Sequence, residues 1–136
     1  MIDYRINSPI STEEFIDLLK RSTLAERRPI HDFDCMDAMV KNANLLVGAW
    51  AGNLLVGVAR SLTDFHFACY LSDLAVDESY QGKGIGKTLI RYTQEALGPH
   101  CWLTLLSAPQ AQDYYPKIGF ENNSQCWELG PEMTLR

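Results

Sequence analysis

Hydrophobic residues along this chain recur with two periods, one typical of strands and one typical of helices. Short apolar runs bounded by Gly, Pro, Asn or Ser predict strands. Six segments fit that description: Ile2–Ile6, Leu45–Trp50, Leu54–Arg60, Phe67–Val76, Cys101–Leu106 and Ser124–Leu129. Between the second and third of them lies Ala51-Gly52-Asn53, a spacing that predicts a hairpin.

Two helices are predicted in the first third of the chain. Ser11 and Glu14 fit a capping box, and Ile10 and Phe15 are placed to form the hydrophobic staple that accompanies it. The next helix covers about residues 32–40. Its inward side chains are expected to be those at helical spacing, namely Phe33, Met36 and Val40.

Two more helices are predicted later in the chain. One follows Gly84 and ends at Gly98-Pro99, a pair typical of a helix C-terminus. The other begins at Pro109, where a missing N–H costs little, and ends at Gly119. The element order β-α-α-β-β-β-α-β-α-β predicts an α+β fold (α/β in some schemes), with one parallel crossover in a mostly antiparallel sheet.

Length and composition bound the class of protein. At 136 residues with 46% hydrophobic residues, the chain predicts one domain with a real core. No apolar run approaches the roughly 18 residues of a membrane span, and no signal peptide is visible. The four cysteines form no C-x-x-C pair, and no metal-ligand spacing is seen. We therefore expect a cytoplasmic protein without a metal or a membrane partner.

The net charge of −5 and the pI of about 5.1 argue against nucleic acid as a partner, because that binding needs Lys and Arg to neutralise phosphates. An acidic chain is compatible with a cationic substrate. The same charge also suits the ordinary solubility of a small domain.

The segment Gln81–Thr88, with sequence QGKGIGKT, is the strongest candidate for chemistry. Alternate glycines at a helix start let several N–H groups converge on a phosphate. The dinucleotide fingerprint G-x-G-x-x-G fails, because Lys87 or Leu89 stands where its last glycine belongs. The Walker A pattern fails at its first glycine, where Gln81 stands.

The pattern Q/R-x-x-G-x-G/A does fit, from Gln81 to Gly86, and it follows the run LSDLAVDESY. A second segment, AQDYYPKIGF, covers Ala111–Phe120. Together, the two segments resemble the acyl-CoA-binding motif and the A-x-x-[FY]-Y-x-K-x-G-F segment of the GNAT superfamily of N-acetyltransferases. The resemblance covers about residues 67–120, and residues 1–66 carry no diagnostic motif.

The resemblance implies that acetyl-CoA is the donor and that its pantetheine arm lies between two splayed parallel strands, Phe67–Val76 and Cys101–Leu106. Contacts are implied with Leu74, Ala75 and Val76, and a backbone N–H of Leu74 or Ala75 would polarise the thioester carbonyl. The pyrophosphate would be held by the loop residues Gln81, Gly82, Lys83, Gly84, Ile85, Gly86, Lys87 and Thr88.

The resemblance also assigns roles to side chains. Tyr115 occupies the position of the family's general-acid tyrosine, which protonates the departing thiolate. Apart from the resemblance, an amine with a pKa near 10 must lose a proton before it attacks, and Asp73, two residues before Ala75 on the central strand, is the first choice for that base. The further candidates are Glu78, Asp64, His66 and His31. Many members carry an Asn where this chain has Ala108, so that pantetheine contact is either lost or replaced by Ser107 or by backbone.

Two functions remain open at this stage. One is an acetyl-CoA-dependent N-acetyltransferase that acts on a primary amine of a small molecule or peptide. The other is a non-catalytic acyl-CoA-binding or protein-interaction module with the same fold. The acceptor and the oligomeric state, with a homodimer as one option, are open.

Overall fold

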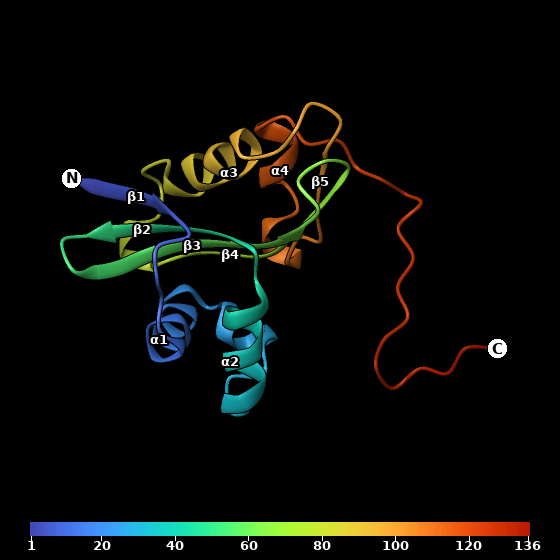
Figure 1. Cartoon of the computed structure of the whole chain (residues 1–136), viewed down its shortest axis with the longest axis horizontal. Helices are drawn as coiled ribbons and strands as arrows, with labels where there is room; N and C mark the ends of the chain where they lie inside the picture. The colour runs from blue at the N-terminus through green and yellow to red at the C-terminus, as the bar shows by residue number, and fades with distance from the viewer. The chain divides into compact units, whose positions relative to one another are not determined.

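The computed structural model describes all residues, 1–136, and the chain divides into two compact units, Met1–Leu106 and Ser107–Arg136. The first unit contains a five-stranded sheet with helices on both faces (Figure 1). This mixed architecture confirms the predicted α+β class. A single domain over the whole chain stays a prediction.

The strands of the sheet follow one another in chain order, β1-β2-β3-β4-β5. The first four strands pair antiparallel, whereas β4 and β5 pair parallel as predicted. Gly52, with φ of 61°, makes the tight β2–β3 turn, a backbone conformation that favours glycine. The strands are β1 (Ile2–Ile6), β2 (Leu45–Ala51), β3 (Leu54–Thr63), β4 (Ala68–Val76) and β5 (Trp102–Leu105).

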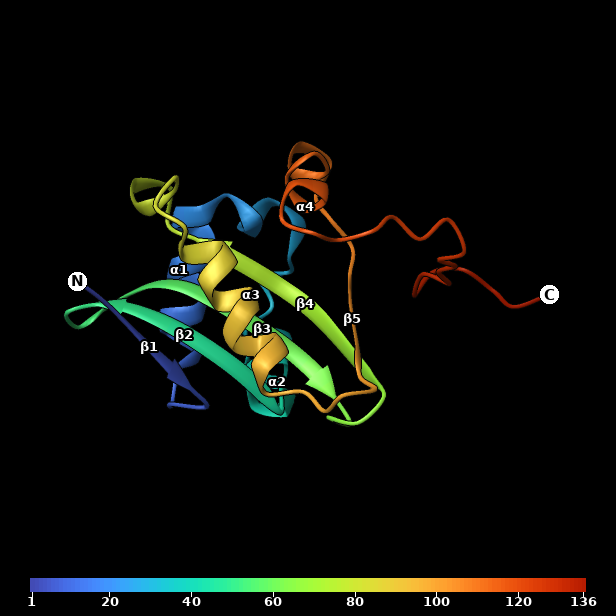
Figure 2. The ribbon, with the colours of Figure 1, turned by 90° about the horizontal axis from the view of Figure 1, so that it is seen from above.

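Helices α1 (Thr12–Ser22) and α2 (Phe33–Asn42) cover one face of the sheet, and α3 (Ile85–Glu95) covers the other (Figures 1 and 2). Two short 3-10 helices complete this unit, η1 (Leu24–Arg27) after α1 and η2 (Glu78–Tyr80) before α3. No helix combines the length and the apolar character that a membrane crossing requires.

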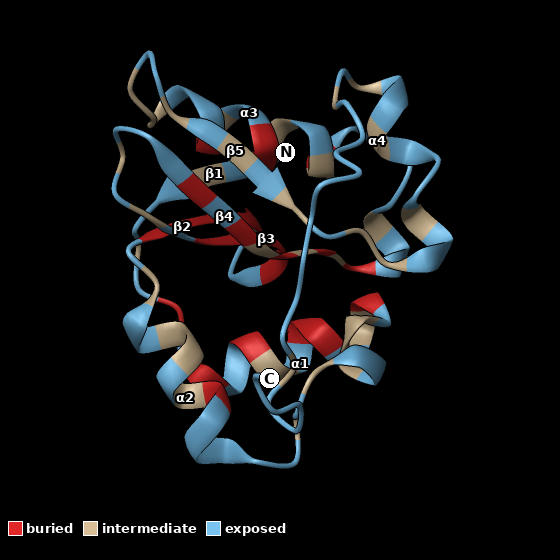
Figure 3. Cartoon of the chain, turned by 90° about the vertical axis from the view of Figure 1, so that its right-hand side faces the viewer, coloured by how far each residue is buried: buried red, intermediate tan, exposed pale blue.

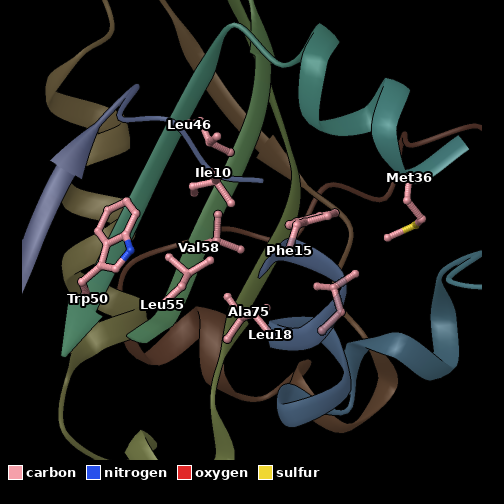
Figure 4. Packing of buried hydrophobic residues seen from close by; sticks show 10 residues of the cluster. Ile10, Phe15, Leu18, Met36, Leu46, Trp50, Leu55, Val58 and Ala75 are labelled. Carbon is pink, nitrogen blue, oxygen red and sulfur yellow. The ribbon is translucent and has the colours of Figure 1, made fainter. Parts of the chain in front are cut away.

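The first predicted helix corresponds to α1, and its buried side chains contribute to the core between α1, α2 and the sheet. The Ser11–Glu14 capping box is formed in both directions, and Ile10 and Phe15 are both buried as the staple predicts. Leu18 and Met36 join them against the apolar face of the sheet (Figure 4). Several buried positions lie along α1, whereas Met36 is the one buried position of α2 (Figure 3).

On the opposite face, α3 packs closely on β3 at a glycine. A Cβ on Gly57 would lie 3.1 Å from side-chain carbons of both Ile85 and Leu89. The absence of a side chain at Gly57 therefore lets the first turns of α3 approach the sheet. This contact fixes the helix start that carries the glycine loop.

Two helix predictions need correction in this unit. Phe33 is exposed rather than inward, because it lies in the first turn of α2 and the buried part of the helix begins at Met36. Helix α3 ends at Glu95 with Ala96 as its C-cap. Gly98 lies beyond that end and donates its N–H to the Phe65 carbonyl at 2.8 Å, so it serves a loop contact instead of the cap.

In the second unit, the single helix predicted from Pro109 to Gly119 is divided in two. A 3-10 turn, η3, covers Pro109–Ala111, and a four-residue helix, α4, covers Tyr114–Lys117. Pro116 lies in the first turn of α4, where the N–H that proline lacks would have no partner within the helix. The short helix therefore accepts this proline without a broken hydrogen bond.

The strand predicted at Ser124–Leu129 is wrong, since the segment pairs with no other strand. Gln125 instead donates its N–H to the side chain of Asn123 at 2.8 Å, which forms a local turn. An alternating pattern describes side chains only, whereas a strand also needs a partner for its backbone.

Candidate functional site

The parallel strands β4 and β5 separate partway along β4. Their pairing runs from Ala68 with Trp102 to Leu71 with Leu105, and there it ends. Strand β4 continues to Val76, with β3 as its only neighbour. The last residues of β4 therefore have one free backbone edge on the side of β5, which is the splay that the resemblance implied.

The direction of the free backbone groups follows from one hydrogen bond. Asp77 donates its N–H to the carbonyl of Val56 in β3 at 2.8 Å. Because successive strand residues point to opposite edges, Ala75 also faces β3, while Leu74 and Val76 face the gap. The geometry thus favours Leu74 over Ala75 as the N–H donor to a bound group.

The free edge leads through η2 into the glycine loop. Gly82 and Gly84 have φ of 76° and 79°, in the left-handed region that strongly favours glycine, and no atom lies within 4 Å of where a Cβ would stand on either. Gly84 is the N-cap of α3 and has no side chain to cap the helix. The N–H groups of Ile85, Gly86 and Lys87 therefore lack partners within the helix.

The glycine loop itself also has free donors, because the N–H groups of Gly82, Lys83 and Gly84 make no hydrogen bond in the structure. Free N–H groups at the positive end of a helix dipole form a binding site for phosphate oxygens. The lysines at 83 and 87 are exposed and add positive charge to the same turn. The residues present therefore fit a pyrophosphate.

Three side chains of the loop are already engaged. Lys83 Nζ lies 5.1 Å from the centre of the Tyr80 ring. Gln81 donates from Nε2 to the Val76 carbonyl at 3.2 Å, which occupies one acceptor on the free edge of β4. Thr88 donates its hydroxyl to the Gly84 carbonyl at 2.9 Å, so this hydroxyl is left as an acceptor rather than a donor.

Asp77, at the junction between β4 and η2, is a buried anchor. It accepts hydrogen bonds from the N–H of Ser79 at 2.7 Å and from the guanidinium of Arg21. Burial opposes ionisation, but these two donors outweigh it and lower the pKa of Asp77. Arg21 also donates to the Leu55 carbonyl at 2.8 Å, which ties α1 to the strands beside the loop.

Asp73, the predicted base, lies in an environment that does not suit that role. Its side chain is 0% exposed, and its two oxygens accept hydrogen bonds from Arg28 and Arg60. An amine or a water molecule has no access to a carboxylate in this position. The structure therefore favours a structural role for Asp73 and leaves the base to another group.

Asp64 is also unsuited to be the base. Its carboxylate accepts three backbone N–H bonds, from His66, Phe67 and Ala68, and these hydrogen bonds, chiefly those from Phe67 and Ala68, lower its pKa to about 2. So weak a base does not deprotonate an amine efficiently near neutral pH. Glu78, His31 and His66 are exposed and remain candidates.

Tyr115, the predicted acid, lies in α4 in the second unit. Its ring makes edge-on contacts with Tyr114 and Phe120, with centroids 5.3 Å and 5.4 Å away. Burial, with a smaller effect of Tyr114, raises the pKa of Tyr115, so the hydroxyl stays protonated at neutral pH. Ser107 is half-buried in the same unit, and its contact with pantetheine stays a prediction.

Sequence reasoning missed Arg21, Arg28 and Arg60. The two partners of Asp73 are 45 and 13 residues away from it along the chain, so no local pattern points to them. The one available signal was an arginine at position 60 within an apolar strand, where a charge needs a partner. No three His, Cys, Asp or Glu side chains gather in a group that could hold a metal ion.

Comparisons with known proteins identify the family and the fold. The family model of the acetyltransferase (GNAT) domain matches residues 12–128. A GNAT-family acetyltransferase from Streptococcus pneumoniae has the same fold, with a TM-score of 0.78 at 18% identity over 97% of this chain and 100% of that chain. An aminoglycoside N-acetyltransferase solved with CoA has a TM-score of 0.69 at 17% identity, and the match covers 97% of this chain and 95% of that chain.

Among curated relatives, the chloroplastic GCN5-related N-acetyltransferase 2 of Arabidopsis thaliana is 36% identical over 69 residues. That match covers 49% of this chain and only 27% of the relative's length. The family model, in contrast, extends over most of the chain and includes both the glycine loop and Tyr115. The chain belongs to the GNAT family of acetyltransferases.

Proposed function

We propose that this protein is an acetyl-CoA-dependent N-acetyltransferase that acetylates a primary amine of a small molecule or a peptide. One observation carries the proposal: β4 leaves β5 after Leu71, and its free edge leads directly into a helix start with unpaired N–H groups. An extended edge can pair with an amide-containing arm, and the helix start can hold the pyrophosphate to which that arm is joined.

In this proposal, the N–H groups that face the gap bind the donor. Val76 pairs with the pantetheine arm, and its carbonyl becomes available when Gln81 releases it. Leu74 directs its N–H at the thioester carbonyl. A backbone donor fixed in this way stabilises the negative charge that develops on that oxygen when the carbon becomes tetrahedral.

The acceptor amine gives one proton to water or to an exposed base and attacks the thioester carbon directly. The C–N bond forms, the tetrahedral intermediate collapses, and the C–S bond breaks to release CoA as a thiolate. Tyr115 donates its phenolic proton to that sulfur, and the proton that the nitrogen loses as the amide forms returns to Tyr115 through solvent. Its raised pKa keeps the proton in place until the thiolate forms. The ordinary pKa values of a thiol, about 8.5, and of tyrosine, about 10, are close enough for the proton to pass to the sulfur.

The acceptor class rests on chemistry and on similar structures. An aminoglycoside N-acetyltransferase and a ribosomal-protein-alanine N-acetyltransferase from Brucella melitensis both share this fold. These names describe one small-molecule amine acceptor and one protein amine acceptor. The net charge of −5 would favour either cation in its encounter with the protein.

A thermal-shift measurement with acetyl-CoA, CoA and a dephosphorylated nucleotide control tests the donor. A ligand at 100 times its Kd stabilises a protein by about 2.7 kcal/mol, which is an easily measured shift in Tm. CoA release is then followed with an aminoglycoside, a peptide with an N-terminal alanine and a lysine peptide. Binding without release on any amine would favour the non-catalytic module, and absence of binding would reject both functions.

A further inference from the structure

Two arginines from different parts of the chain converge on Ser72 and Asp73 of β4. Arg28 donates from Nε to Asp73 and from Nη2 to the Ser72 carbonyl, the latter at 2.8 Å. Arg60 donates from Nε to Asp73 and from Nη2 to the Ser72 hydroxyl at 3.0 Å. Two adjacent residues thus accept four hydrogen bonds from two guanidinium groups.

These bonds lie where β4 changes its pairing. The β3–β4 register shifts between Arg60 and Ser61, so that Ser72 is the extra residue of a bulge. Ser72 is also the first residue of β4 after the last pair with β5. Its carbonyl, which has no partner on β5, accepts from Arg28 instead. Arg28 thus supplies a hydrogen bond to a backbone group that has no partner strand, and Arg60 holds the Ser72 side chain beside it.

We propose that Arg28 and Arg60 are positioning residues for acyl transfer, which rests on the proposed function. By holding Ser72 and Asp73, they fix the bulge, and the bulge decides which edge the N–H of Leu74 faces. A displaced Leu74 would still lie on β4, but its N–H would no longer be aligned with the developing oxyanion. Asp73 joins the two guanidinium groups and is itself inaccessible to the substrates.

The same arginines join β4 to the segment between α1 and α2. Arg28 directly follows η1, and Arg60 donates from Nη1 to the carbonyl of Met39 in α2 at 3.1 Å. A shift of either segment therefore reaches Ser72 through one side chain. The network makes the placement of the Leu74 N–H dependent on the helices that cover this face of the sheet.

Arg28→Gln is the main test, because Arg28 is partly exposed and its loss leaves Asp73 paired with Arg60. Arg27→Gln is the matched control, since it removes the same charge from an exposed neighbour whose side chain makes no hydrogen bond. We expect kcat to fall by roughly 10- to 100-fold in Arg28→Gln only, the size of effect that a small misplacement produces. The Kd of CoA should be unchanged within error, because the glycine loop is intact.

A second variant and a second readout complete the test. Arg28→Lys can reach Asp73 or Ser72 but not both, so its kcat should lie between those of wild type and Arg28→Gln. In the ligand-free protein, the backbone order parameter of the Leu74 amide should fall from about 0.85 toward 0.6 in Arg28→Gln and stay at the wild-type value in Arg27→Gln.

Folded Arg28→Gln with a lower Tm but wild-type kcat would overturn the proposal and leave the arginine a stabilising role. If the wild-type protein transferred acetyl to no amine, the proposed function would fail instead. In that case, an unchanged order parameter at Leu74 would also reject the positioning, and a lower one would support it.

Discussion

Arg60 and Asp73 face each other across β3 and β4 and form an ion pair whose side chains are 6% and 0% exposed. Ions in such a position are stable only when their hydrogen-bonding groups are satisfied. Here Arg28 supplies a second positive partner, so one carboxylate serves two guanidinium groups. The pair stands immediately before the free edge of β4, and it links the stability of the sheet to the geometry of the candidate site.

Asp73→Ala should lower the free energy of unfolding by about 3–5 kcal/mol, because it leaves two guanidinium groups without their carboxylate. Urea denaturation followed by fluorescence measures this change. Asp3→Ala is the control, since it breaks the exposed pair with Arg5 and should cost under about 1 kcal/mol. Equal losses for both variants would contradict the structural role of Asp73.

Gly84→Ala should weaken binding of acetyl-CoA more than it weakens folding. An alanine at φ of 79° costs about 1–2 kcal/mol of backbone strain, and relief of that strain turns the helix N-terminus away from the phosphates. Gly52→Ala is the matched control, with φ of 61°, open space around the Cβ and a place in the β2–β3 turn. Calorimetric titration with acetyl-CoA measures the affinity of each variant, and urea denaturation measures its stability.

Comparable stability losses with weaker binding only in Gly84→Ala would support the pyrophosphate assignment. Unchanged affinity in a folded Gly84→Ala protein would remove the glycine loop from the donor site.

Tyr115→Phe should reduce kcat by about 10²- to 10⁴-fold, the usual contribution of a general acid, and leave the Kd of acetyl-CoA close to that of wild type. The wild-type kcat should fall as pH rises through the raised pKa of Tyr115, because the hydroxyl then loses the proton that it donates. The kcat of the variant should show no such fall. Steady-state CoA release measured between pH 6 and 11 tests both points.

Tyr114→Phe is the control for this experiment, because it removes the neighbouring hydroxyl and keeps both rings in contact. If the two variants had the same kcat as wild type, another group would have to protonate the thiolate.

Asp64→Asn should reduce the loss of stability in acid. The folded-state pKa of Asp64, about 2, lies below its ordinary value of 3.8, so its contribution is complete above about pH 4 and disappears as pH falls toward 2. The variant lacks this contribution at every pH, so its free energy of unfolding should change less between pH 5 and 2. Urea titrations across that range measure the difference.

Glu13→Gln serves as the control for Asp64→Asn, because Glu13 is exposed and its carboxylate accepts no hydrogen bond. If the free energy of unfolding fell by the same amount between pH 5 and 2 in Asp64→Asn and in Glu13→Gln, the three N–H bonds to Asp64 would contribute nothing measurable to stability.

Local features of the sequence predicted much of the first unit. The capping box at Ser11 and the two left-handed glycines of the loop depend on neighbours in the chain, and they appear where the sequence placed them. The strand predicted at Ser124–Leu129 failed because strand formation depends on a partner elsewhere. The prediction that Phe33 faces inward was wrong for a related reason, since helical spacing does not say how far a helix extends over its sheet.

The family, the glycine loop and the order of most elements could be predicted from the sequence, because short-range spacing and backbone conformation decide these features. The burial and pairing of Asp73 and the edge that the Leu74 N–H faces emerge only when the chain is folded. Both depend on where β4 leaves β5 and on arginines brought in from positions 28 and 60. A carboxylate in a sequence shows its chemistry, but burial and partners decide whether that carboxylate can accept a proton or must hold the fold together.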